Sequence, residues 1–349
     1  MKTKTLMRWH SKLGIYTGVV LFIVALTGIV LLFQDNLMWL GYEHQANSKH
    51  KTLDELYTVV ENNFPNHDIN GFRFLGSKTE PITVVIDSCD ISKYVYIDPF
   101  TGNFVEPNAT INSFLDISHN LHTGFIASSI GIFIVFIASL AYLILTITGI
   151  ILFRKNIKKA LLFKIKKGKK KSRYFHYMFG VWTIPFNFLL AISGIYLIVP
   201  QFIGSLIGSG AYHSGEAIPA KNNPLLTISL DSVLTKTHNS YPDFELNYLR
   251  MPTSANDLSL KLWGNLPKSW HTGELATEIF YNVNTNEFNI TRESEHSFGT
   301  QVALALHTIH VGQFGGFIVK IIYTLFTLLL IVLNITGYLL FYRRSKLKR

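Results

Sequence analysis

The sequence predicts an α+β membrane protein with four transmembrane helices in two parallel-oriented repeats, and each repeat carries one external α+β domain. Three observations predict this fold: long apolar segments, an uneven distribution of charge, and a set of motifs that occurs twice. Of the 349 residues, 48% are apolar or aromatic and only 15% are charged. Such a composition is typical of a membrane protein.

Four segments are long and apolar enough to be transmembrane helices. Crossing the hydrocarbon core of a bilayer takes roughly 20 apolar residues in a helix. The segments are residues 13–33, 130–153, 179–199 and 317–342. The first follows a basic N-terminus, but its apolar run is longer than that of a signal peptide and no small-x-small cleavage site follows it. We therefore expect this segment to be retained as a transmembrane helix.

The charges predict the orientation, because short Lys- and Arg-rich segments beside a membrane helix tend to stay in the cytoplasm. All 22 carboxylates lie in residues 34–118 and 200–303, whereas 21 of the 32 Lys and Arg residues lie outside these segments. Both chain ends are thus expected in the cytoplasm and both carboxylate-containing segments outside. The net charge of +10 matches a bilayer with anionic inner-leaflet lipid, and we expect no nucleic acid as a partner.

The predicted domain organisation alternates membrane helices with polar segments. It runs as transmembrane helix 1 (1–33), first external domain (34–118), transmembrane helix 2 (119–153), basic cytoplasmic loop (154–175), transmembrane helix 3 (176–199), second external domain (200–303), transmembrane helix 4 (304–342) and basic cytoplasmic tail (343–349). Within each external domain, a helix should precede short strands of alternating apolar and polar residues. The predicted helices are 53–62 and 230–237, and the predicted strands are 71–75, 81–86, 94–97, 246–250, 258–262 and 279–282.

Both external domains are expected to contain the same turn after the third strand. In the first domain, residues 98–104 include Gly102, which supplies a positive φ. In the second, residues 284–288 include Asn286, and Asn tolerates a positive φ better than most residues do. We therefore predict that Asn286 takes the place of Gly102.

The membrane helices show an internal repeat. The first span matches the third at a shift of 166 residues, and the second matches the fourth at a shift of 188. The matched elements are His10 and His176, Thr27-Gly28 and Ser193-Gly194, His119 and His307, His122 and His310, and Thr148-Gly149 and Thr336-Gly337. Both halves begin on the same side, so a pseudo-twofold axis along the membrane normal should relate them, unlike the inverted repeats of many transporters.

Six repeated histidines are the candidate functional residues, because an ionisable residue at a membrane helix is costly and points to function. They are His10, His176, His119, His122, His307 and His310. Neutral imidazole binds haem iron axially, and two imidazoles from facing helices hold a porphyrin between them. The axis pairs His10 with His176 at an inner site and His122 with His310 at an outer site. The sequence thus predicts two haems, each with bis-histidine ligation.

Other interpretations of these residues stay open. A lone interfacial histidine is often a hydrogen-bonded anchor, and the i, i+3 spacing of His119 and His122 also suits a transition metal. The Thr-Gly and Ser-Gly pairs serve either close helix packing or a flat macrocycle. A continuous helix from His122 to Arg154 would be ~48 Å long, against a hydrocarbon core of ~30 Å, so the outer site should lie close to external water.

Short motifs in a fixed order run through nearly the whole chain. They are Arg8-Trp9-His10 with Gly14, Leu121-His122-Thr123-Gly124, His176 with Gly180 and Trp182, Leu306-His307 with His310, Gly312, Gly315 and Gly316, and the turn Tyr96-Ile97-Asp98-Pro99-Phe100-Thr101-Gly102. In these motifs the chain resembles the PepSY-associated transmembrane family of bacterial inner-membrane proteins. That family includes iron-regulated membrane proteins and ferric-siderophore reductases.

The resemblance implies b-type haem held by histidines of the membrane helices and a place in the bacterial inner membrane, with PepSY-like domains in the periplasm. It also implies an oxidoreductase that takes electrons from a cytoplasmic donor and reduces a ferric siderophore or another iron chelate on the outer side. The second external domain departs from the family pattern, because Asn282 to Asn286 replace the Asp-Pro-x-Thr-Gly turn.

Three functions follow from these observations. The first is a di-haem transmembrane electron-transfer protein that reduces a ferric siderophore. The alternative is a non-catalytic membrane module whose PepSY-like domains bind or regulate an exported protein or peptidase. A second alternative, a metal or siderophore transporter, calls for polar groups deep in the membrane, where Asn187 and Asn334 are the only amide side chains.

Overall fold

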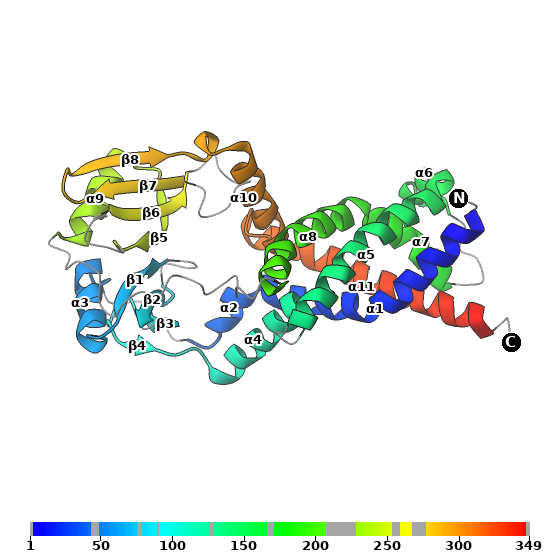
Figure 1. Cartoon of the computed structure of the whole chain (residues 1–349), viewed down its shortest axis with the longest axis horizontal. Coiled ribbons are helices and arrows are strands. Elements are labelled where there is room, and N and C mark those ends of the chain that lie inside the picture. The colour runs from blue at the N-terminus through cyan, green and yellow to red at the C-terminus, as the bar shows by residue number, and fades with distance from the viewer. Residues whose placement is uncertain are drawn as a thin grey trace. The chain divides into compact units, whose positions relative to one another are not determined.

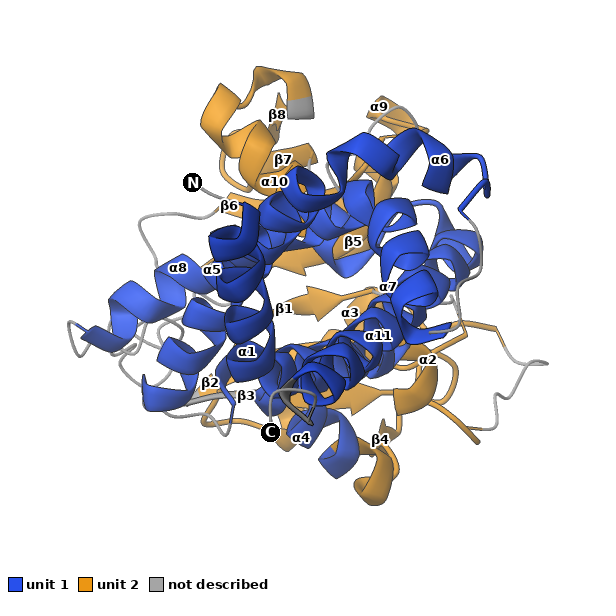
Figure 2. Ribbon diagram, turned by 90° about the vertical axis from the view of Figure 1, so that its right-hand side faces the viewer, with its two compact units in different colours: residues 1–34, 113–211, 309–349 blue, residues 35–112, 212–308 orange. Residues whose placement is uncertain are grey.

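The computed structural model describes residues 3–42, 49–74, 79–88, 91–125, 129–165, 171–206, 228–252, 259–266 and 277–346. The chain forms two compact units, shown in two colours in Figure 2. The helical unit comprises Met1–Gln34, Ser113–Ala211 and Ile309–Arg349, and the sheet unit comprises Asp35–Asn112 and Tyr212–Thr308.

The helical unit contains four helices that are long and apolar enough to cross a membrane. They are α1 (Thr3–Leu32), α5 (Ser129–Phe153, continued by the short α6, Ile157–Leu161), α8 (Ile184–Leu206) and α11 (Gly316–Lys346) (Figure 1). Helix α1 packs against α5 and α11, and α5 packs against α8. The four predicted spans are therefore confirmed, with the third displaced towards the C-terminus because α8 begins only at Ile184.

Three further helices lead into these spans: α4 (Ala109–Gly124), α7 (Lys171–Trp182) and α10 (Phe298–Val311). The continuous helix expected from His122 to Arg154 is instead divided, because α4 ends at Gly124 and Phe125 has a φ of 41° that a right-handed helix does not allow. Between α10 and α11 the break lies at glycines with positive φ, Gly312 at 67° and Gly315 at 68°. The predicted helices 119–153, 176–199 and 304–342 thus each begin in one helix and continue in another.

The sheet unit is built on an antiparallel sheet of eight strands among the described residues, in the order β4-β3-β2-β1-β5-β6-β7-β8. The strands are β1 (Asp68–Arg73), β2 (Ile82–Ser88), β3 (Ile91–Ile97), β4 (Phe104–Val105), β5 (Glu245–Arg250), β6 (Ser259–Asn265), β7 (Thr277–Asn282) and β8 (Glu287–Thr291). Strands β1 and β5 pair in the middle, so the two predicted external domains are halves of one sheet. The sequence did not predict β4 and β8.

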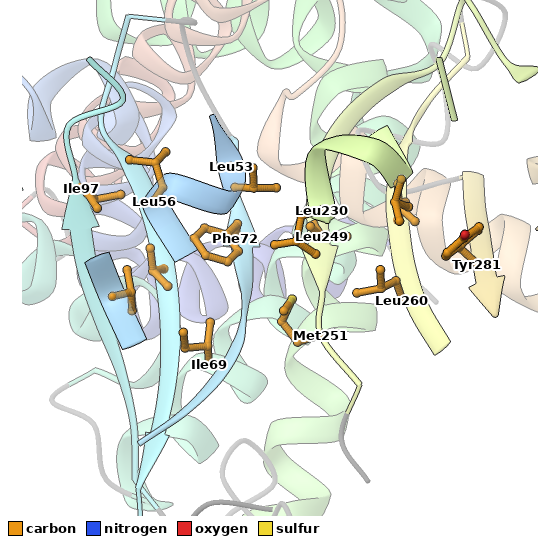
Figure 3. Close-up of a cluster of buried hydrophobic side chains, with 14 of the residues drawn as sticks. Leu53, Leu56, Ile69, Phe72, Ile97, Leu230, Leu249, Met251, Leu260 and Tyr281 are labelled. Carbon is orange, nitrogen blue, oxygen red and sulfur yellow. The ribbon is translucent and has the colours of Figure 1, made fainter. Parts of the chain in front are cut away.

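Helices α3 (Leu53–Asn63) and α9 (Leu230–Ser240) lie over one face of this sheet, as their shared core shows. Apolar side chains of both halves form one hydrophobic cluster, in which Phe72, Leu249 and Tyr281 are almost fully buried (Figure 3). Removal of this apolar surface from water is the main force that holds the two halves together. The remaining short helices are α2 (Gln34–Met38), η1 (Arg154–Asn156) and η2 (Glu293–Glu295).

Each half of the sheet unit caps the helix of the other half. Asp231 accepts hydrogen bonds from the backbone N–H groups of Leu53 and Asp54, at 3.0 and 2.9 Å. In return, Asp54 accepts from the Leu230 N–H at 2.6 Å and from the Ser229 hydroxyl at 2.5 Å. The first N–H groups of a helix lack partners within the helix, so these carboxylates stabilise both N-termini and join the halves.

The two turns predicted to be equivalent have the same geometry. Gly102 and Asn286 have φ values of 74° and 57°, which confirms that Asn286 takes the place of the glycine. Four residues earlier in each turn, the side chain of Asp98 or Asn282 accepts hydrogen bonds from two backbone N–H groups of the same turn. Burial raises the pKa of Asp98, but hydrogen bonds from the Tyr42 hydroxyl and these N–H groups lower it below its ordinary value. The departure from the family pattern therefore leaves the turn intact.

Candidate functional site

The helical unit brings together the two histidine pairs that the repeat predicts. The ring centroids of His10 on α1 and His176 on α7 are 6.5 Å apart, with their planes at 83°. The ring centroids of His122 on α4 and His310 on α10 are 6.1 Å apart, with their planes at 62°. Each ring thus faces its equivalent in the other half of the chain.

The pairs lie at different levels of the helical unit. Gly28 contacts His122 and follows His10 by 18 residues on the uninterrupted helix α1. At 1.5 Å per residue this is ~27 Å, close to the ~30 Å thickness of the hydrocarbon core. The two pairs are therefore placed near opposite faces of a bilayer that α1 would cross.

Backbone carbonyls define the tautomer of two of the rings. The Nδ1 atom of His122 lies 2.9 Å from the Val24 carbonyl oxygen, and that of His176 lies 3.1 Å from the Leu333 carbonyl oxygen. A carbonyl oxygen only accepts, so Nδ1 must carry the proton in both rings. The unprotonated lone pair is then on Nε2, which is the form of imidazole that binds a metal.

Hydroxyl groups give the other two rings the same tautomer. Nδ1 of His10 lies 2.8 Å from Oγ1 of Thr148, and Nδ1 of His310 lies 2.9 Å from Oγ of Ser193. Each hydroxyl donates its own proton to the backbone carbonyl four residues earlier, at 2.7 and 2.6 Å respectively. With its proton used in this way, the hydroxyl oxygen accepts from Nδ1–H. All four rings therefore carry their lone pair on Nε2.

The glycine that follows each Thr or Ser lies against the edge of the same imidazole. A Cβ atom added to any of these glycines would approach the ring carbon Cε1 of a histidine on another helix. The distances would be 3.1 Å from Gly28 to His122, 3.1 Å from Gly337 to His176, 3.3 Å from Gly194 to His310 and 3.6 Å from Gly149 to His10. We call each Thr-Gly or Ser-Gly pair with its histidine a cradle. At Gly28, Gly194 and Gly337 this distance is tighter than an ordinary contact, so close packing against an imidazole favours glycine, whereas the contact at Gly149 is an ordinary one.

The four cradles have a simple arrangement. Each histidine is held within its own half of the chain: His10 by α5, His122 by α1, His176 by α11 and His310 by α8. Each pair, in contrast, joins one histidine from each half. The helices of one half therefore orient a ring, and the packing of the two halves sets the distance between the rings.

The arrangement fits a metal ion bound between two imidazoles. Two rings that bind one ion through bonds of about 2.0 Å have centroids roughly 6 Å apart. Among the described residues, no three His, Cys, Asp or Glu side chains lie together as a metal-ligand group. Each donor set is thus a pair of neutral imidazoles, which suits a haem iron whose other four ligands come from the porphyrin.

His119 and His307 lie on the same helices as His122 and His310 but are not brought into the pairs. Both side chains are exposed, and neither ring forms a hydrogen bond among the described residues. A role for either as an iron ligand or a substrate contact stays a prediction.

The amide side chains within the spans are used in helix packing. Asn187 accepts a hydrogen bond from the Tyr142 hydroxyl of α5 and donates to the Thr183 hydroxyl, both at 3.0 Å. Asn334 of α11 donates to the Gly18 carbonyl of α1 at 2.8 Å. These contacts stabilise the helical unit. The amide groups that a transport pathway was expected to use are thus engaged in helix packing.

Four long apolar helices together with a separate antiparallel sheet define a multi-pass membrane protein of the α+β class. The comparison with protein families then identifies the family. The model of the PepSY-associated TM region matches residues 7–344, nearly the whole chain, and the chain belongs to this family. The comparison with curated proteins finds no match.

Proposed function

We propose that this chain is a di-haem electron-transfer protein of the bacterial inner membrane that reduces a ferric chelate, such as a ferric siderophore, on the periplasmic side. One observation carries the proposal: two pairs of imidazoles, near opposite ends of α1, face each other at 6.5 and 6.1 Å with Nδ1 of each ring in a hydrogen bond. Structural histidines have no need of this arrangement at both levels.

The residues of the chain have distinct tasks in this proposal. His10 and His176 would hold one haem b, and His122 and His310 the other, each through Nε2. Hydrogen bonds from Nδ1–H to the carbonyl and hydroxyl oxygens orient the rings and make Nε2 a better electron-pair donor to iron. Haem iron with two histidine ligands accepts and releases one electron at a time. An electron from a cytoplasmic donor would thus cross the membrane and convert ferric to ferrous iron in the chelate.

The proposed orientation has both termini in the cytoplasm and the sheet unit in the periplasm. The basic segments support it, because residues 154–173, from the end of α5 into the first turn of α7, include 11 Lys and Arg residues and no carboxylate. His10 and His176 lie close to these basic segments in the chain, so their pair would be the inner one.

The test is a reduced-minus-oxidised visible spectrum of the full-length protein purified in detergent. We expect b-type Soret and α bands with two haems per chain. His10→Ala and His176→Ala should each remove one haem, and His122→Ala and His310→Ala the other. His238→Ala, an exposed histidine of the sheet unit, is the matched control and should retain both.

Retention of both haems in all four variants would refute the pairing, and so would loss of the same haem from a variant of each pair. A colourless protein would end the redox proposal altogether. If that protein co-purified with an exported partner, the non-catalytic membrane module would become the better explanation.

A further inference from the structure

Among the described residues, α3 and α9 cover one face of the sheet, and the opposite face is rich in cationic and aromatic side chains. Phe72 and Leu249 point into the core under α3 and α9, so their neighbours in the strands point to the opposite face. The strand register places these neighbours in two adjacent rows. One row contains Arg73, Tyr248 and Trp263, and the other contains Gly71, Arg250 and Lys261.

Tyr248 and Trp263 form a stacked aromatic pair, here called the platform, in the middle of this face. Their rings are stacked, with centroids 5.3 Å apart and planes at 10°. The Tyr248 ring leans over Gly71, where an added Cβ would lie 2.9 Å from ring carbon Cε2, and its hydroxyl donates to Asn70 at 3.0 Å. A ring held by a stacking partner, a glycine and a hydrogen bond keeps its orientation when a second flat group approaches.

Two guanidinium groups flank the platform. Within the described part of the chain, neither the Arg73 nor the Arg250 side chain forms a hydrogen bond or ion pair, and Nε of Arg250 has no acceptor. Burial raises the pKa of the Tyr248 phenol, while the nearby charges of Arg250 and Arg73 oppose this shift. A guanidinium group without a carboxylate partner is a good binding group for an anion, so this face favours negatively charged oxygen atoms.

The charge balance of the face is positive at its centre. Lys261 lies next to Arg250 and approaches the Phe280 ring to 5.2 Å. The carboxylates stand on the flanking strands: Asp87 on β2, which accepts a hydrogen bond from Asn70 at 2.7 Å, and Glu278 on β7 beside Trp263. An anion would thus be drawn towards β1, β5 and β6.

We propose that this face binds an anionic iron chelate that carries aromatic rings, of the catecholate class. The rings of such a chelate would stack on Tyr248 and Trp263, and its negative oxygen atoms would accept hydrogen bonds from Arg250 and Arg73. A neutral chelate built on aliphatic hydroxamates offers neither feature. The inference rests on the proposed function only in taking an iron chelate as the substrate.

The experiment measures binding of the gallium(III) tris-catecholate complex to the full-length protein by isothermal titration calorimetry. Gallium(III) has the charge and nearly the size of ferric iron, but the haems cannot reduce it, so the readout is binding alone. We expect saturable binding that weakens about tenfold in Arg250→Gln and in Arg73→Gln, because each loses charged hydrogen bonds. Trp263→Leu should weaken binding by a similar factor through the loss of stacking.

Arg292→Gln is the matched control, because Arg292 is an exposed arginine of the same unit that pairs with Glu295 at 3.3 Å, and it should bind as the wild type does. A neutral gallium trihydroxamate should bind weakly and equally to all variants. The proposal is overturned if Arg250→Gln and Arg73→Gln both bind like the wild type, or if the neutral complex binds as tightly as the anionic one. Binding of anionic lipid vesicles without binding of the gallium complex would also overturn it and indicate a membrane-facing surface.

The outcome separates this inference from the proposed function. Binding of the gallium complex to a protein without haem bands would retain the chelate site and refute the electron-transfer proposal. Haem bands without binding of the gallium complex would refute the chelate site and leave the electron-transfer proposal standing.

Discussion

The two halves of the chain repeat the same residue types around His10 and His176 but hold these rings through different contacts. His10 depends on a hydroxyl, because within the described residues Thr148 Oγ1, at 2.8 Å, is the hydrogen-bond partner of its Nδ1. A Cβ atom added to Gly149 would lie at an ordinary contact distance from the His10 ring. The second half relies on the backbone. His176 donates to the Leu333 carbonyl at 3.1 Å, with the Thr336 hydroxyl only a secondary contact at 3.3 Å.

The glycines differ in the opposite sense, because the glycine of the second half lies closer to its imidazole than the glycine of the first half does. A Cβ added to Gly337 would lie 3.1 Å from the His176 ring, which is tighter than an ordinary contact, whereas one added to Gly149 would lie 3.6 Å from the His10 ring. A repeated motif therefore specifies a common plan, and small shifts of the helices decide which atom holds the ligand. The first half should be sensitive to loss of its hydroxyl, and the second half to loss of its glycine.

The largest expected effect is that of Thr148→Val. The change keeps the shape of the side chain but removes the acceptor for His10 Nδ1–H, so haem affinity at the His10–His176 pair should fall about 10- to 100-fold. Thr336→Val should change it only about two- to threefold, because the Leu333 carbonyl remains to hold His176. Haem titration of protein expressed without haem measures both. Equal losses in the two variants would show that the hydroxyls are interchangeable.

Gly337→Ala should have the next largest effect. The new methyl group would displace the His176 ring by a few tenths of an ångström, and we expect haem occupancy at this pair to fall several-fold. Gly149→Ala should retain full occupancy and stabilise α5 by up to about 1 kcal/mol, since Ala is the better helix former. Haem content and the electron paramagnetic resonance spectrum of the ferric haem report ring position. The glycine account fails if Gly149→Ala proves the more damaging change.

The sequence predicted these pairs well because side chains carry the signal. Repeat spacing alone identified which histidines face each other, and positive-φ tolerance identified Asn286 as the equivalent of Gly102. The sequence could not predict that the carbonyls of Val24 and Leu333 accept hydrogen bonds from the histidines, because every residue has a carbonyl and none is marked in the sequence. The pairing of β1 with β5 was missed for a related reason: backbone hydrogen bonds between distant strands leave no specific residue pattern. The break after Gly124 depends on the conformation of Phe125, a residue type that gives no sign of a turn.

The exchanged helix caps allow a comparison of the halves in the sheet unit. Asp231→Ala should expose the N-terminus of α3 in the first half, and Asp54→Ala that of α9 in the second, each at a cost of about 1 kcal/mol. Hydrogen–deuterium exchange should therefore rise at the start of α3 in the first variant and of α9 in the second. A rise within the helix of the mutated residue alone would contradict the exchange of caps.

The contribution of Asp231 should also depend on pH. Burial raises its pKa, but hydrogen bonds from the N–H groups of Asp54 and Leu53 outweigh burial and lower the pKa from its ordinary value of 3.8. A carboxylate with a lowered pKa stabilises the fold above its unfolded value and loses this effect as the pH falls through its folded value. The stability difference between wild type and Asp231→Ala should be complete above pH 3.8 and should shrink below it. Urea unfolding across this range measures it, and a pH-independent difference would mean that the negative charge does not contribute.

The smallest effects are expected at the paired turns. Gly102→Asn should alter the stability of the sheet unit by less than about 0.5 kcal/mol, because Asn tolerates the positive φ and the neighbouring Lys51 side chain is flexible. Asn286→Gly also suits its φ, yet it should cost about 1 kcal/mol. It removes the oxygen that accepts from the buried Tyr281 hydroxyl at 2.6 Å and from Lys236 at 3.2 Å. Urea unfolding of the two variants compares a turn that needs only a backbone conformation with one that has also acquired a side-chain contact. Equal stabilities would show that the Asn286 amide does no more than replace the glycine.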